Sequence, residues 1–139
     1  MKIFLDSCVV LAASLSGAGA SRQIFDFAVR QGWQLVVSPW VLREVRDNLA
    51  NKPPDAARAW AGLRGRVTVE GDEFTFDWPL VFDVAKDKPV LITALACADV
   101  LLTLDRRDFR TLLGQSVYEL RVLTPGEFLC NEREAGRLL

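Results

Sequence analysis

The sequence contains no histidine among its 139 residues. Catalysis by a Ser-His-Asp or Cys-His arrangement is therefore excluded, as is a zinc site that depends on histidine ligands. If the protein is a hydrolase, the base in its reaction must be a carboxylate or a water activated by a metal ion.

An excess of positive charge is also absent. The chain has 17 lysines and arginines against 18 aspartates and glutamates, so its net charge is -1. Such a balance provides no overall positive field to attract nucleic acid. Any contact with RNA or DNA must therefore use a local patch of the surface.

Cysteine is scarce and shows no functional spacing. The three cysteines, Cys8, Cys97 and Cys130, lie far apart in the sequence and do not form a metal-ligand motif. This usage suits a reducing cytosol. We expect the three side chains to be buried as small hydrophobic groups.

Long apolar runs are missing as well. Asp99 divides the longest stretch, residues 91–104, and Asp6 interrupts the apolar N-terminal segment. These acids argue against a membrane span and against a signal peptide. Half of the residues are hydrophobic and 25% are charged, which is typical of a globular protein. We expect a cytoplasmic protein, without membrane contact, folded as one domain over residues 1–139.

Strand patterns alternate with helical patterns along the chain. Strands are expected at residues 2–5, 34–37, 67–69, 100–103 and 120–123, with a further extended segment at 74–78. Helices are expected at residues 8–13, 21–31, 39–49, 56–63, 89–98, 106–113 and 125–130. The alternation predicts an α/β fold with a parallel sheet covered on both faces.

Several helix ends carry recognisable capping residues. Ser21 is expected to cap the second helix and Gly32 to close it, with the apolar stripe formed by Ile24, Phe25, Ala28 and Val29. Ser38 followed by Pro39 predicts the start of the third helix. Gly114 is expected to close the helix at 106–113.

Four acids fall where a parallel sheet places its ligand site. Asp6 follows the first strand and Asp105 follows the strand at 100–103. Asp87 precedes a helix, and Glu44 lies in the first turns of another. Because ligands bind beyond the carboxyl ends of the strands, we expect these acids to converge there.

Several carboxylates in close proximity repel one another, and a hard divalent cation relieves that repulsion. Mg²⁺ and Mn²⁺ prefer oxygen ligands and leave positions open for water and phosphate. Each acid also has a structural interpretation when it is taken alone. Asp6 can form a turn, Glu44 can be solvated, and Asp87 can be a helix cap, while Asp105 and Asp108 can be turn or first-turn residues. Asp99 is interpreted as a structural cap or turn before a buried strand.

The motifs resemble those of the PIN-domain family, in the same order and over residues 1–130. The first strand and helix read MKIFLDSCVVLAA, and the second acidic motif reads SPWVLREV. The third and fourth motifs lie in KDKPVLITALACADVLLTLDRRDF, and the closing strand and helix read VLTPGEFL. The resemblance implies a three-layer α/β/α sandwich around a central parallel sheet.

The resemblance also implies a site and an activity. The implied metal ligands are Asp6, Glu44, Asp87 and Asp105, with Asp108 as an accessory catalytic acid and with Ser7 and Thr103 beside them. The implied cofactor is Mg²⁺ or Mn²⁺. The implied reaction is endonucleolytic cleavage of RNA by a metal-activated water, which leaves 5′-phosphate and 3′-hydroxyl ends.

Small members of the family are often VapC-like toxins of bacterial type II toxin–antitoxin pairs. That similarity implies a cognate antitoxin and a homodimer. Basic residues near the acids in the sequence are candidates for positioning RNA: Arg22, Lys86, Arg106, Arg107 and Arg110.

The chain departs from the family pattern in two places. Leu104 stands where the family often has glycine, and spacing does not decide between Asp83 and Asp87 as the third ligand, although Asp87 directly precedes its helix. Residues 51–81 match no motif. The alternatives are a structure-specific DNA nuclease, a non-catalytic PIN-fold scaffold, or a phosphatase of another α/β class, although Asp6-Ser7-Cys8 lacks the DxD pattern expected of the last.

Overall fold

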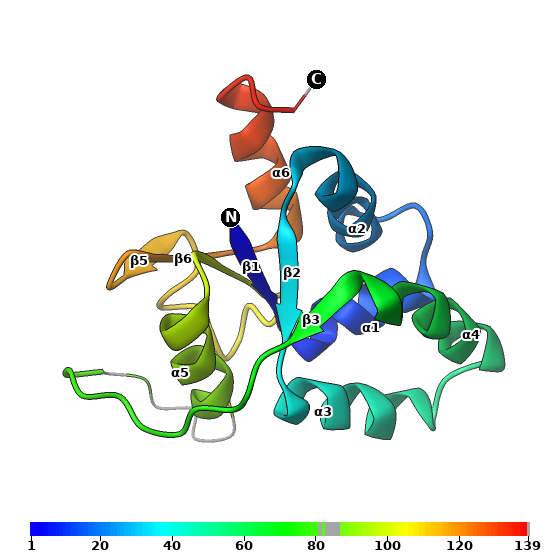
Figure 1. Ribbon diagram of the computed structural model, residues 1–139, viewed down its shortest axis with the longest axis horizontal. Coiled ribbons are helices and arrows are strands. Elements are labelled where there is room, and N and C mark those ends of the chain that lie inside the picture. Colours follow the sequence, from blue (N-terminus) through cyan, green and yellow to red (C-terminus); the bar gives the residue numbers. More distant parts are fainter. Residues whose placement is uncertain (81, 83–86, 139) are drawn as a thin grey trace.

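Six strands form a single sheet in the order β3-β2-β1-β4-β6-β5 (Figure 1). The computed structural model describes residues 1–80, 82 and 87–138. The strands are β1 (Lys2–Leu5), β2 (Gln34–Val37), β3 (Val67–Val69), β4 (Val100–Leu102), β5 (Gln115–Val117) and β6 (Leu120–Leu123). All neighbours pair in parallel except β5 and β6, which are antiparallel. The α/β class is confirmed, and the sheet is mostly parallel.

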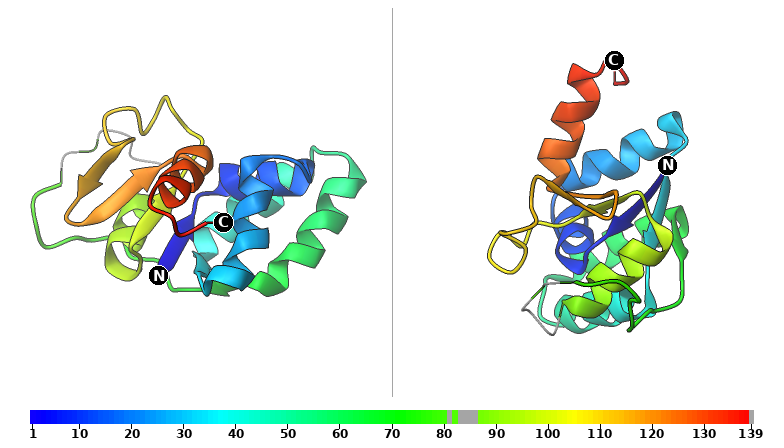
Figure 2. Two further views of the ribbon diagram at one scale, coloured as in Figure 1. Left: turned by 90° about the horizontal axis from the view of Figure 1, so that it is seen from above. Right: turned by 90° about the vertical axis from the view of Figure 1, so that its left-hand side faces the viewer.

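Helices flank the sheet (Figure 2). They are α1 (Ser7–Leu15), α2 (Ala20–Gln31), α3 (Pro39–Leu49), α4 (Pro54–Leu63), the 3₁₀ turn η1 (Arg64–Arg66), α5 (Lys88–Cys97) and α6 (Pro125–Glu134). Helix α1 contacts α2, α3 and α4, while α2 contacts α6 and α3 contacts α5.

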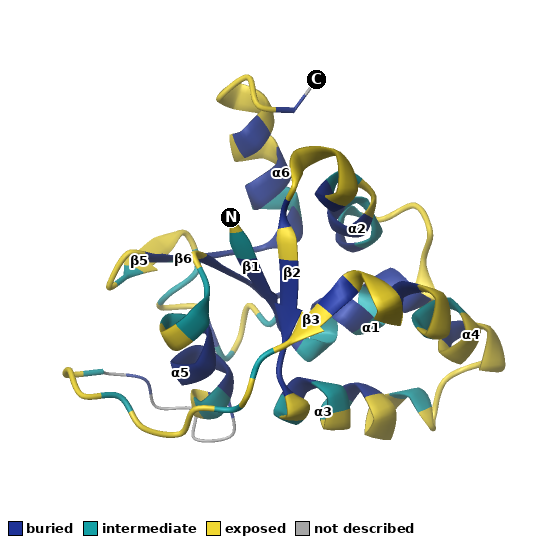
Figure 3. Ribbon diagram, viewed as in Figure 1, coloured by how far each residue is buried: buried dark blue, intermediate teal, exposed yellow. Residues whose placement is uncertain are grey.

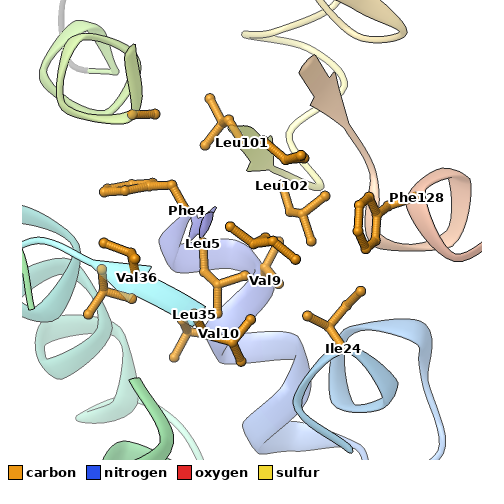
Figure 4. Packing of buried hydrophobic residues seen from close by; sticks show 14 of the residues in the cluster. Phe4, Leu5, Val9, Val10, Ile24, Leu35, Val36, Leu101, Leu102 and Phe128 are labelled. Atoms are coloured by element: carbon orange, nitrogen blue, oxygen red, sulfur yellow. The ribbon is translucent and has the colours of Figure 1, made fainter. Parts of the chain in front are cut away.

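The two faces of the sheet are both apolar, as a covered parallel sheet requires. Phe4 and Val36 are paired neighbours on one face, and they lie on the opposite side of the strands from Leu5 and Leu35 (Figure 4). All four side chains are nearly or fully buried. Burial is concentrated along the inner strands and on the helix sides that face them (Figure 3).

The cap of α2 differs from expectation at its start. Gly19 occupies the N-cap position, and Ser21 lies inside the first turn, where it is buried. Gly32 does close the helix, with a left-handed φ of 68°. The prediction that Val29 belongs to the apolar stripe of this helix is wrong, because its side chain is 75% exposed.

The segment 106–113 forms turns rather than the expected helix. The Asp105 side chain accepts a hydrogen bond from the Asp108 backbone amide at 2.9 Å. This is the geometry of a helix N-cap, and the Phe109 amide donates to the Asp105 carbonyl at 3.1 Å, but the segment continues as turns and not as a regular helix. Phe109 anchors the turns because its side chain is fully buried. Gly114 ends them with a φ of 78°.

Two further expectations need correction. Cys130 is exposed and Cys8 and Cys97 are only partly buried, so the cysteines are not simple core residues. Residues 74–78 are not part of the sheet.

No single helix in the described part of the chain is long and apolar enough to cross a membrane. Helices α1 and α2, which meet at a 96° bend, reach that length and apolar composition only when they are taken together.

Candidate metal centre

The carboxyl ends of β1 and β4 lie side by side, because Leu5 pairs with Leu102. The next residue after β1 is Asp6, whose backbone amide donates to the Leu102 carbonyl at 3.0 Å. Asp6 is also the N-cap of α1, where its Oδ1 accepts a hydrogen bond from the Ser7 amide at 2.8 Å. The strand and the helix together therefore hold this carboxylate in a fixed orientation.

Asp6 is almost completely buried, at 4% exposure. Burial raises the pKa of its carboxyl group, because the charged form loses contact with water. Hydrogen bonds from Thr103, Ser7 and Cys8 oppose that rise, and the negative charge of Asp105 adds to it. Asp6 thus lies where a further positive charge would stabilise its ionised form.

Thr103 connects the two strand ends. Its hydroxyl donates to Asp6 Oδ2 at 2.8 Å and accepts from the Asp105 backbone amide at 3.1 Å. The side chain is fully buried. One hydroxyl group therefore fixes both the carboxylate after β1 and the backbone that carries the acid after β4.

Cys8 makes a second connection across the same gap. Its Sγ lies 3.5 Å from both Asp6 Oδ2 and Thr103 Oγ1, and it accepts a hydrogen bond from the Leu104 amide at 3.2 Å. Burial, followed by the charge of Asp6, raises the pKa of the Cys8 thiol to about 12. The thiol is therefore neutral at physiological pH and can donate to Asp6.

Cys8 was missed as a site residue by sequence reasoning. Its position in the first turn of a helix, two residues after the acid, was the available signal. The size of a cysteine side chain suggested core packing instead.

Three acids come together next to this network. Carboxylate oxygens of Asp87, Asp105 and Asp108 all lie within 4.8 Å of one another. Asp87 is the N-cap residue of α5 and is buried, whereas Asp105 and Asp108 are half-buried in the turns after β4. Like charges at this separation repel, and a divalent cation with oxygen preference would relieve the repulsion. The donor set fits Mg²⁺ or Mn²⁺.

The remaining predicted acids lie outside this group of three. Glu44 is half-buried on α3, a helix that contacts α5, and its backbone carbonyl accepts a hydrogen bond from the Asn48 side chain. Asp6 is connected to the group through Thr103 and the Asp105 backbone. Asp83, the alternative third ligand, lies outside the described residues.

The basic residues near the acids have different surroundings. Arg22 is partly buried and donates to the Ala13 carbonyl at 2.8 Å, while Arg106 lies 3.8 Å from Glu127. Arg107 and Arg110 are exposed. Lys86 lies outside the described residues. Leu104, the departure from the family pattern, is 39% exposed beside the Thr103 network.

Comparison with known protein families identifies a family for this chain. The sequence model of the PIN domain family matches residues 2–107, which include all four predicted metal ligands. No curated protein matches the chain at a significant level. PIN domains are generally metal-dependent nucleases that act on nucleic acid and typically bind a divalent metal ion.

Proposed function

The chain belongs to the PIN domain family, and we propose on that premise that it is a metal-dependent endoribonuclease. The observation that carries the proposal is the cluster of Asp87, Asp105 and Asp108, whose carboxylate oxygens lie within 4.8 Å of one another. Carboxylates gathered in this way, in a chain without histidine, suit metal-assisted hydrolysis of a phosphodiester bond.

These three aspartates are the residues that would hold the metal ion, with Asp6 and Glu44 as further candidate ligands from the predicted motifs. Oxygen donors alone favour Mg²⁺ or Mn²⁺ over softer metals. When bound, such an ion supplies Lewis acidity and lowers the pKa of water, which are the contributions that phosphodiester hydrolysis needs.

The protein's own contribution is to hold these acids in place before substrate arrives. Thr103 and Cys8 fix the Asp6 carboxylate, and Thr103 also fixes the Asp105 backbone. Preorganised groups of this kind avoid reorganisation during the reaction. The exposed side chains of Arg107 and Arg110 are candidates to contact RNA phosphates near the acids.

The biological role that fits best is that of a VapC-like toxin in a bacterial type II toxin–antitoxin pair. The family match supports it, since such pairs are common in the family. This role entails RNA as the substrate, a cognate antitoxin that blocks the site, and a homodimer as the working form.

The test is cleavage of a labelled single-stranded RNA pool by purified protein freed of any partner. EDTA, Mg²⁺ and Mn²⁺ are compared for the wild type, for Asp105→Asn and for Asp47→Asn, a control that removes an exposed acid far along α3. We expect metal-dependent cleavage by the wild type and the control but not by Asp105→Asn. Cleavage of structured DNA but not of RNA would refute the ribonuclease and indicate a DNA nuclease. A folded protein that binds no metal and cuts neither substrate would refute the proposal and favour a binding scaffold.

A further inference from the structure

A cavity of about 330 Å³ lies away from the acids, between the loop after β3 and the β5–β6 hairpin. It is lined by Thr75, Phe76, Asp77, Trp78, Leu95 and Tyr118. Its volume is at the lower end of the range of roughly 300–1,000 Å³ that small-molecule sites occupy. It is therefore large enough for a single flat ring system.

Three aromatic rings form one wall of this cavity. The Tyr118 ring lies 5.3 Å from both the Phe76 ring and the Trp78 ring, and the Phe76 and Trp78 rings are 6.2 Å apart. Trp78 is 63% exposed and Tyr118 is 44% exposed. Large aromatic surface is thus left in water instead of being packed into the core, which is typical of a binding surface.

The turn of the hairpin holds Tyr118 in an unfavourable backbone conformation. Tyr118 and Glu119 have φ angles of 46° and 73°, in the left-handed region. Two-residue turns with positive φ at both positions normally use asparagine and glycine. A tyrosine in this conformation is strained, and such strain is a pointer to function. The Tyr118 hydroxyl also donates to the Pro79 carbonyl, which ties the hairpin to the loop.

The charge around the cavity selects against phosphate. Asp77 lines it and Glu119 is the neighbour of Tyr118, and neither forms an ion pair with any residue in the described ranges. Carboxylates repel a phosphate group but accept hydrogen bonds from N–H donors. A flat aromatic ligand with N–H groups on its edge would satisfy both the rings and the carboxylate.

The cavity and the acids lie toward opposite ends of strand β6. Tyr118 follows β5 and precedes the start of β6, whereas Leu123, at the other end of β6, pairs with Leu102 beside the acid network. Along α5, eight residues separate Asp87 from Leu95, which is about 12 Å at a rise of 1.5 Å per residue. A few nucleotides of an extended strand cover such a distance. Figure 2 shows the hairpin and the loop on one side of the molecule.

We propose that this cavity binds one unpaired guanine base of a single-stranded RNA, a few nucleotides from the bond that is cut. The inference rests on the proposed ribonuclease function and names a specificity site for it. Trp78 and Tyr118 stack on the base, as aromatic side chains do in single-strand recognition. Asp77 accepts from the two adjacent N–H groups on the guanine edge, an arrangement that uracil cannot match with its single N–H group.

The test measures binding without any cleavage. Guanosine 5′-monophosphate and uridine 5′-monophosphate are titrated into ¹⁵N-labelled wild-type protein in EDTA, and the Trp78 indole signal is followed by NMR. We expect that signal to shift with the guanine nucleotide and to respond at least tenfold more weakly to the uracil nucleotide, as judged by Kd.

Two variants and one control locate the binding. Trp78→Ala should weaken guanine-nucleotide binding about tenfold or more, because a stacking surface is lost. Asp77→Asn should remove the preference for guanine while leaving stacking intact. Phe74→Ala is the control. Phe74 is an exposed aromatic residue of the same loop, but it contacts Trp40 and does not line the cavity. The Phe74→Ala variant should therefore bind the guanine nucleotide as the wild type does. A dispersed NMR spectrum verifies that each variant is folded.

The outcomes separate this inference from the proposed function. Guanine binding at Trp78 in a protein that never cuts RNA would uphold the base site and refute the ribonuclease. RNA cleavage that is unaffected by Trp78→Ala, together with no nucleotide response at Trp78, would refute the base site alone. A shift produced by N-acetyl-arginine amide, but by neither nucleotide, would also overturn the inference, since it would assign the cavity to a cationic protein segment.

Discussion

Two buried carboxylates in this protein behave in opposite ways. Asp6 and Glu132 are 4% and 1% exposed, so water is excluded from both. Burial raises the pKa of Asp6, whereas the pKa of Glu132 is lowered. The cause is Arg137, whose Nε and Nη2 donate to the two Glu132 oxygens at 2.6 and 2.9 Å. Burial alone therefore does not determine the charge state of an acid in this fold.

The two carboxylates differ in the groups that donate hydrogen bonds to them. Glu132 receives a guanidinium group from its own chain, which compensates its charge. Asp6 receives a hydroxyl, a thiol and an amide, and it lies near a second acid, Asp105. In the part of the chain that the structure describes, no lysine or arginine forms an ion pair with Asp6 or Asp105.

The comparison separates a structural acid from a candidate functional one. At the end of α6 the positive charge is built into the sequence, and the result is a stabilised C-terminal turn. At the carboxyl end of the sheet, Asp6 is oriented by a hydroxyl, a thiol and an amide, and its neighbour Asp105 adds negative charge. The carboxylate oxygens of Asp87 and Asp108 lie within 4.8 Å of that of Asp105, in a group that could hold a metal ion.

The largest expected effect is the response to added metal. Mn²⁺ at about a hundredfold above its Kd should increase the unfolding free energy of the wild type by about 2.7 kcal/mol. Asp105→Asn should lose this increment, because one ligand of the cluster is removed. Glu132→Gln should keep it, since Glu132 belongs to a different compensated pair. Urea unfolding with Mn²⁺ and with EDTA measures all three. An equal increment in all three proteins would place the metal elsewhere.

Thr103→Val should weaken metal binding without removing a carboxylate. The substitution keeps the shape of the side chain but deletes the hydroxyl that holds Asp6 Oδ2 and the Asp105 amide. Loss of such an orienting group typically lowers metal affinity by about 10- to 100-fold. Calorimetric titration with Mn²⁺ measures the change, and Thr103→Ser should restore most of the affinity. If valine binds Mn²⁺ as tightly as the wild type, the hydroxyl does not orient the ligands and this prediction is wrong.

Several elements of the fold could be predicted because local sequence and tertiary environment agree. The strands at 2–5, 34–37, 67–69 and 120–123 coincide with β1, β2, β3 and β6. Short apolar runs between turn residues are buried on both faces of a parallel sheet, so the local pattern was sufficient. The position of Asp6 and Asp105 after neighbouring strands followed from the same logic.

Other features depend on partners that are distant in sequence. Strand β5 contains Gln115 and Ser116 and has no strand pattern of its own, so it depends on pairing with β6. Glu132 lies in a run of polar residues, and its burial depends on Gly136, whose φ of 75° returns the chain so that Arg137 reaches it. The roles of the four predicted ligands stay predictions, although two of them, Asp87 and Asp105, lie in one cluster with the predicted accessory acid Asp108.

Arg137→Met should reduce stability and leave metal affinity unchanged. Without the guanidinium group, the buried Glu132 carboxylate loses two hydrogen bonds and its counter-charge. An unsatisfied buried group of this kind costs about 1–3 kcal/mol. Arg133→Met is the matched control, since Arg133 is exposed on the same helix. Urea unfolding at neutral pH compares the two, and equal losses would show that the Glu132–Arg137 pair contributes nothing specific.

The smallest effect is a dependence of stability on acid pH. The folded pKa of Glu132 lies below its ordinary value of 4.5 because of the hydrogen bonds from Arg137. An acid whose pKa is lowered by folding stabilises the protein fully above its unfolded pKa, and this contribution is lost as the pH falls through the folded pKa. Between pH 6 and the acid range below about 4.5, the wild type should therefore lose stability more steeply than Glu132→Gln. Glutamine retains the shape of the side chain but does not titrate, so the difference between the two unfolding curves isolates one carboxylate. Parallel curves over that range would mean that Arg137 does not lower the pKa of Glu132 in solution. The opposite pKa shifts of Glu132 and Asp6 could then not be explained by the partners of the two carboxylates.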